Sequence, residues 1–188
     1  MKAVFIVLFF TLSVQAQQHI AVDLLGSGSL KINGKTNINS FECTFDSSRL
    51  TRSNKISLKP KGDRIEVKNA QLRLNHKNFD CGHRRINNDF DALIKSEEYP
   101  DIYIELLEIF NVKNSEASVK VKINIAGKSK NYTFPIEICN PETTEFQGKW
   151  VLNIKDFDLT PPKKVFGIIV IDEEIEIDFL LKTAISTG

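Results

Sequence analysis

The sequence predicts an all-β protein, a sandwich or barrel of about eight to ten antiparallel strands with one short helix. Apolar residues occupy alternate positions of 119–125 and of 175–181, with Lys120, Lys122 and Asn124 between them in the first segment and Glu176 and Asp178 between them in the second. Period-two alternation places the two sets on opposite faces of a strand. A sheet with one apolar and one wet face is typically antiparallel, and it must cover its apolar face by packing or by closing into a barrel. A closed barrel with an apolar lumen is a candidate container for an apolar ligand.

Turn signals divide the rest of the chain into further strands. In the first half, Gly26-Ser27-Gly28 and Gly34 are expected to separate strands at 19–25, 29–33 and 36–46. Lys61-Gly62-Asp63-Arg64 predicts a tight hairpin between 56–60 and 65–74. The later strands are expected at 102–109, 117–126, 132–140, 146–157, 165–171 and 174–184.

One segment changes from a period of two to helical spacing. A short helix is expected to begin at a cap supplied by Asn87, Asn88 or Asp89 and to run to about Lys95. Its apolar stripe would consist of Phe90, Leu93 and Ile94. Pro100 ends it, because proline disfavours helix in the residue before it.

Residues 1–16 have the features of a secretory signal. Lys2 provides a positive start, an apolar run follows at 3–14, and Val14-Gln15-Ala16 places small residues where a signal peptidase reads. Cleavage is expected after Ala16, leaving residues 17–188 as one domain in the periplasm or outside the cell. An uncleaved anchor is the alternative, and no later apolar run has membrane-spanning length.

The charge of the remaining chain argues against a nucleic-acid partner. Removing Lys2 lowers the Lys plus Arg count from 25 to 24, which equals the 24 acidic residues. A net charge near zero lacks the strong positive field that nucleic-acid binding needs.

The three cysteines allow one disulfide and one free thiol. We favour Cys43–Cys81, whose loop would add about 3–4 kcal/mol in the chain-entropy model. Cys43–Cys139 stays open. In the favoured pairing, Cys139 is expected to be a buried thiol on the apolar side of its strand.

Few residues suggest chemistry. Asp80-Cys81-Gly82-His83 is the one cluster that resembles a ligand set, but its spacing is not that of a structural zinc site. A catalytic Cys81–His83 pair is the enzymatic alternative, and it would require a free thiol. There is no Gly-x-Ser-x-Gly elbow, and the acidic pair Glu97-Glu98 is expected to be solvated. We therefore expect no enzyme, no metal and no required cofactor.

Three stretches together resemble the YceI family of polyisoprenoid-binding-like proteins. The segment 79–102 is similar to the family's helix and the Tyr-Pro-x-Ile strand start that follows it, and 123–136 resembles a family hairpin that leads into a proline-containing strand. The third, 152–162, together with Phe166-Gly167 and the strand from Glu174, resembles the family's Asp-Phe-Gly ending and last hairpin. The chain departs from the family pattern at four positions. Ile86 and Phe90 stand where the family usually has methionines, Asp158 stands where it has glycine, and His83 stands where asparagine is frequent.

The resemblance implies an extended, eight-stranded antiparallel barrel of lipocalin-like shape with a short helical insertion over one end. It also implies binding of a hydrophobic small molecule, such as an isoprenoid quinone or another long-chain lipid, inside the barrel. The expected ligand-binding residues are apolar and lie near the helix and adjacent strands: Phe41, Phe90, Ile94, Ile104, Ile123, Phe134, Phe157, Phe166 and Ile168. The alternative is a filled, ligandless barrel that serves as an interaction module, with 168–171 as a homodimer contact.

Overall fold

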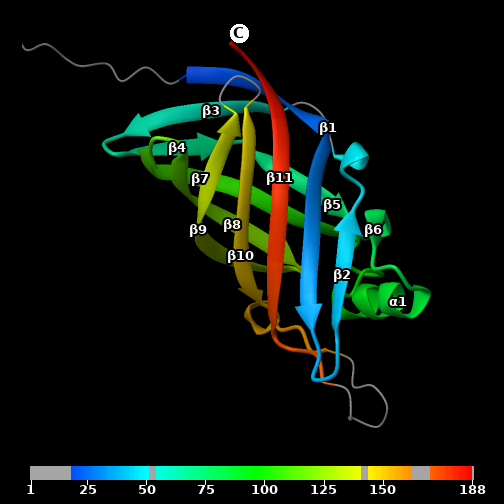
Figure 1. The fold of residues 1–188 in the computed structure, drawn as a ribbon. Helices are drawn as coiled ribbons and strands as arrows, with labels where there is room; N and C mark the ends of the chain where they lie inside the picture. The colour runs from blue at the N-terminus through cyan, green and yellow to red at the C-terminus, as the bar shows by residue number, and fades with distance from the viewer. Residues whose placement is uncertain (1–17, 51–53, 141–143, 162–169, 188) are drawn as a thin grey trace, which may run out of the picture.

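The computed structural model describes residues 18–50, 54–140, 144–161 and 170–187, which include a ring of eight antiparallel strands (Figure 1). The ring runs in the order β1-β3-β4-β7-β8-β9-β10-β11 and closes where β11 pairs with β1. This arrangement confirms the extended eight-stranded barrel. The ring strands are β1 (Gln18–Lys35), β3 (Asn54–Lys61), β4 (Arg64–Lys68), β7 (Asp101–Lys113), β8 (Glu116–Ile125), β9 (Lys128–Asn140), β10 (Glu145–Asn153) and β11 (Glu174–Thr187).

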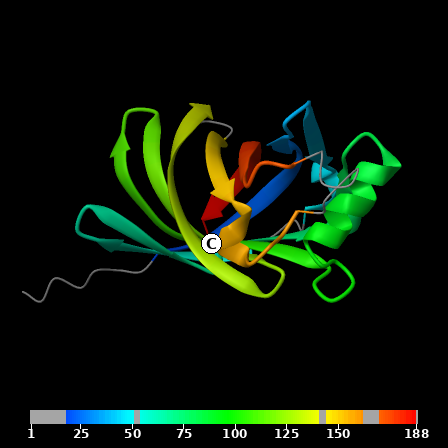
Figure 2. The same cartoon turned by 90° about the horizontal axis from the view of Figure 1, so that it is seen from below.

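Three shorter strands and one helix lie beside the ring. β2 (Ser40–Phe45) pairs with the second half of β1, and β6 (Phe79–Asp80) pairs with β2. β5 (Gln71–Asn75) pairs with the first half of β7, and β4 pairs with the second half of the same strand. Helix α1 (Arg84–Leu93) lies at one side of the barrel, near β2 and β6, and Figure 2 shows the ring strands curving round a common interior. No helix in the described segments is long and apolar enough to cross a membrane.

The alternating pattern that predicted the sheet is confirmed in β8 and β11. All five alternate positions of β8 from Ala117 to Ile125 are at most 7% exposed. In β11, Ile175, Ile177 and Phe179 are buried, and Glu176 between them is exposed. These side chains cover the interior of the ring and form one continuous core with their neighbours.

The predicted break at Gly26-Ser27-Gly28 is wrong, because β1 runs through it as one strand. The pairing of β1 with β11 shifts register between Leu25 and Ser29 instead. A Cβ atom on Gly28 would lie 2.4 Å from the carbonyl oxygen of Leu180. Only glycine permits that close backbone approach, so the segment acts as a bulge within a strand.

The helix begins earlier than predicted. Its N-cap is His83, whose Nδ1 accepts a hydrogen bond from the backbone N–H of Arg85 at 3.1 Å. Asn87, one of the predicted caps, lies inside the helix, and its side-chain oxygen accepts from the backbone N–H of Cys81 at 2.7 Å. The prediction considered only amide and carboxylate caps and omitted a neutral imidazole nitrogen, which is also an acceptor.

Other strands also differ from the prediction, and the strand expected at 65–74 is divided into β4 and β5. The strand expected at 146–157 ends at Asn153 and continues as the 3-10 helix Ile154–Phe157. The Asn153 side chain accepts from the backbone N–H of Lys155 at 2.9 Å and so caps that helix. In the segment expected at 36–46, only Ser40–Phe45 is a strand, and most of the strand expected at 165–171 lies outside the described residues.

The predicted Cys43–Cys81 disulfide is present and joins β2 to the loop before α1. Cys139 is the free cysteine, but it is exposed, so the prediction of a buried thiol is wrong. Phe134 and Ile136 of β9 are buried, which places the even-numbered positions inside the barrel and Cys139 outside it. The prediction assigned the strand to the wrong phase of its alternation.

An apolar cavity as the candidate ligand site

The ring encloses a cavity of about 300 Å³ that is lined almost entirely by hydrocarbon side chains. Among the described residues that line it, none carries a charge, and the side chains with a polar atom are Gln71, Trp150 and Thr183. Among the other lining residues are Ile20, Val22, Leu30, Ile56, Leu72, Ile104, Leu106, Val121, Phe134, Phe146, Phe179 and Leu181. Apolar residues with a few polar groups are typical of ligand pockets, and this volume is at the lower end of their range.

The interior has a hollow part and a packed part. Along β10, Phe146 and Trp150 line the cavity, whereas Leu152 and the following Ile154 are buried in the core. The same change occurs along β8, where Val121 lines the cavity and Ile123 is 2% exposed in the packed part. Side chains therefore close the barrel beyond the level of Trp150, on the side of the 3-10 helix that follows β10.

An aromatic cluster forms the wall where the hollow part meets the packed part. The Phe134 and Trp150 rings stack with centroids 4.3 Å apart and an interplanar angle of 3°. Phe179 meets both rings edge-on, at 6.2 Å from Phe134 and 5.7 Å from Trp150. Gly148 makes room for this cluster, because a Cβ there would lie 2.8 Å from the Phe179 ring.

Of the nine predicted binding residues, two line the cavity, and the others lie in or against the packed core or outside the described residues. Ile104 and Phe134 line the cavity. Ile94, Ile123 and Phe157 belong to the packed core, and Phe41 and Phe90 are partly buried against it. Phe166 and Ile168 lie outside the described residues, as does the first half of the proposed dimer segment 168–171. Of that segment, Val170 is exposed and Ile171 forms a bridge with Thr36.

The prediction missed much of the actual wall. Trp150, Phe146, Phe179 and Leu181 all line the cavity, and none was among the candidates. The alternation of 175–181 had already placed Phe179 and Leu181 on the apolar face. Applying the same period to β10 would have added Phe146 and Trp150.

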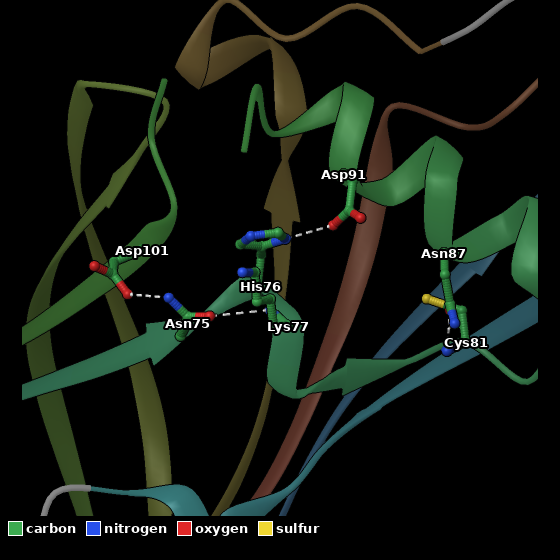
Figure 3. Close-up of polar contacts among 7 residues, drawn as sticks. All are labelled: Asn75, His76, Lys77, Cys81, Asn87, Asp91 and Asp101. Atoms are coloured by element: carbon green, nitrogen blue, oxygen red, sulfur yellow. Dashed lines mark hydrogen bonds and ion pairs between the residues drawn. The ribbon is translucent and has the colours of Figure 1, made fainter. Parts of the chain in front are cut away.

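The side chains around the loop Asp80–His83 hold the loop against helix α1. A hydrogen-bond network there connects the loop to α1 (Figure 3): His76 Nδ1 lies 2.8 Å from Asp91 Oδ1, and Asn87 accepts from Cys81. The sulfur of Cys81 is bonded to Cys43, so it is not an available nucleophile. The described residues contain no group of three or more side chains that could hold a metal ion.

A buried carboxylate lies at the end of the same network. Asp101 is 7% exposed, and its side chain forms an ion pair with Arg73 at 2.7 Å. It also accepts a hydrogen bond from the Asn75 side chain at 2.9 Å (Figure 3). The hydrogen bond from Arg73 lowers the pKa of Asp101 below its ordinary value. Both partners lie on β5 and hold the carboxylate in its charged form, so Asp101 anchors β5 to β7.

A larger open depression on the outside of the barrel has different chemistry. Its wall includes Lys61, Asp63, Arg64, Glu66 and Glu108, so it carries charges of both signs. Arg64 pairs with Glu108 at 3.2 Å, and the Arg64 side chain is half-exposed. Surface pairs of this kind are well solvated and contribute little to stability. The apolar lining of the cavity inside the ring makes that cavity the better candidate site.

A ring of eight antiparallel strands around an apolar cavity defines the class of this protein as a small closed β-barrel. The YceI-like domain model matches residues 11–183, and the chain belongs to that family. Two solved structures share the fold. BcnA of Burkholderia cenocepacia has a TM-score of 0.62 at 19% identity, covering 85% of this chain and 96% of that chain. A polyisoprenoid binding domain from Saccharophagus degradans, implicated in plant cell wall breakdown, has a TM-score of 0.58 at 12% identity, covering 87% and 97%. No curated protein sequence matches the chain.

Proposed function

We propose that this protein is an exported carrier that holds a long-chain apolar molecule, such as an isoprenoid lipid, with part of the chain inside the barrel. The observation that carries the proposal is the cavity of about 300 Å³ with an uncharged lining. The polyisoprenoid binding named for a protein of the same fold supports the ligand class. The signal-like residues 1–16 and the Cys43–Cys81 disulfide support export, because disulfides persist in oxidising compartments.

The cavity volume limits how much of a ligand it can enclose. Apolar cavities of about 150 Å³ hold a molecule the size of benzene, so this one has room for about a dozen non-hydrogen atoms. A short amphiphile would fit whole. A polyisoprenoid would place only one end in the cavity, and the rest of its chain would extend beyond it.

A chain-length series tests the proposal. Each buried methylene contributes about 0.8 kcal/mol, which is about a fourfold change in Kd. Across a series of primary alcohols, we expect affinity to rise by about that factor per methylene and to level off at about a dozen non-hydrogen atoms. Trp150 is the single tryptophan and lines the cavity, so its fluorescence reports binding directly.

Two phenylalanines provide a matched comparison. Phe146 lines the cavity, whereas Phe110 lies outside that lining with the Arg64 guanidinium 5.0 Å from its ring centroid. Phe146→Ala should weaken binding of the longer alcohols, and Phe110→Ala should leave it unchanged. Native mass spectrometry of the gently purified protein should also show a retained lipid. A protein that carries no lipid and binds no alcohol would overturn the carrier function and favour a ligandless interaction module.

A further inference from the structure

The cavity wall contains one polar atom without a partner. Trp150 Nε1 is buried and has no hydrogen-bond acceptor, and in the described part of the chain it is the one buried side-chain nitrogen or oxygen in this condition. Buried polar groups are nearly always paired, and an unpaired one in a native protein requires an explanation. A ligand in the cavity that Trp150 lines would supply the missing acceptor.

The position of the indole ring is fixed by its neighbours. Trp150 lies opposite Ile177 in the β10–β11 pairing, its face stacks on Phe134, and Phe179 meets it edge-on. The stacked face is therefore occupied, and Nε1 lies on the ring edge. Since the packed part of the barrel begins just beyond Trp150, an acceptor bound there would lie at the inner limit of the cavity.

The other polar side chains of the wall do not duplicate this role. Thr183 Oγ1 donates to the backbone oxygen of Thr144 at 3.0 Å. Gln71 already has an interaction partner. Trp150 is also a donor with no acceptor capacity, so the group that pairs with it must be an acceptor.

We propose that the bound end of the ligand carries an uncharged oxygen acceptor, a carbonyl, that accepts a hydrogen bond from Trp150 Nε1. This inference rests on the proposed carrier function and adds the chemistry and orientation of the ligand. A carboxylate or phosphate is disfavoured at this position, because none of the described residues that line the cavity is a cation and an unpaired buried charge is very costly. The hydrocarbon part of the ligand would lie along the aliphatic wall that includes Leu72, Leu106 and Ile20.

A pair of isosteric probes tests the inference. 2-Undecanone and 2-methyl-1-undecene have the same size and differ by a carbonyl in place of a terminal methylene. Their Kd values can be measured by headspace partitioning with the wild-type protein and with Trp150→Phe, which keeps an aromatic ring beside Phe134. The quantity compared is the Kd of the alkene divided by the Kd of the ketone. We expect this ratio to be about tenfold larger for the wild-type protein than for Trp150→Phe, because only the wild type donates a hydrogen bond to the ketone.

Phe146→Leu is the matched control, because it alters the wall without removing the donor. It should weaken both probes equally and leave their ratio unchanged. The single indole N–H resonance provides a second readout, and it should move downfield with the ketone and not with the alkene. If both probes bind but the ratio and the resonance do not change, the inference is wrong and the carrier function stands. If neither probe binds, both fail.

Discussion

Phe134 and Phe157 are both buried in the barrel, but only Phe134 lines the cavity. Phe157 is 0% exposed in the packed part, so Phe157→Ala should cost about 3–5 kcal/mol of unfolding free energy through lost transfer energy and a new void. Phe134 already borders empty space on one side. Phe134→Ala should therefore cost less, about 2–3 kcal/mol, made up of its apolar transfer and its stack on Trp150.

For ligand binding the order is reversed, and Phe134→Ala should have the larger effect. Loss of the Phe134 ring removes part of the cavity wall, and we expect geraniol to bind about tenfold more weakly. Phe157→Ala should leave that Kd within about a factor of two, because the side chain does not reach the cavity. Urea unfolding at equilibrium and calorimetric titration measure the two quantities. If Phe134→Ala cost as much stability as Phe157→Ala and left binding unchanged, the lumen would be an ordinary core, and the reasoning would be refuted.

Three further predictions concern other parts of the fold. The Cys43–Cys81 bond closes a sequence separation of 38 residues, so replacing both cysteines by serine should lower the free energy of unfolding by about 4 kcal/mol; a loss below 1 kcal/mol in urea would contradict this. Arg73 holds the pKa of Asp101 below its ordinary 3.8, so this pair stabilises the fold above that pH and the contribution is lost as pH falls through the lower folded value. Urea midpoints from pH 6 to pH 2 should therefore fall less steeply for Asp101→Asn than for the wild type, and parallel curves would refute this. Cys139 is exposed, so native oxidised protein should react with one maleimide per chain by mass spectrometry, and no reaction would show a covered thiol.

Local periodicity was sufficient to predict the all-β class and the inward faces of β8 and β11. It failed where tertiary contacts override local signals. At Gly28 the glycine is required by the nearby Leu180 carbonyl on β11, a strand far along the sequence, and this contact has no local signature. The early start of α1 depends on the His83 imidazole as a cap, and histidine is not among the residues that usually cap helices.

The candidate site was harder to predict than the fold. Inward-facing residues such as Ile123 and Phe134 have equivalent places in their strand patterns, yet one is packed and the other lines the cavity. What separates them is their height along the barrel, which depends on the shear of the whole ring. Trp150, the one tryptophan, was not among the candidates, and its unpaired buried Nε1 is apparent only from the packing of the folded chain.

The pairing of β1 with β11 has a consequence for how the protein folds. Its register joins Ile20 to Thr187 and Asn33 to Glu176, so the seam of the barrel links segments separated by most of the polypeptide. Such a contact carries a large loop-closure entropy, and folds rich in long-range pairing form slowly. The seam cannot form during synthesis until the final strand has been made, and removal of either segment would leave two unpaired edges open to aggregation.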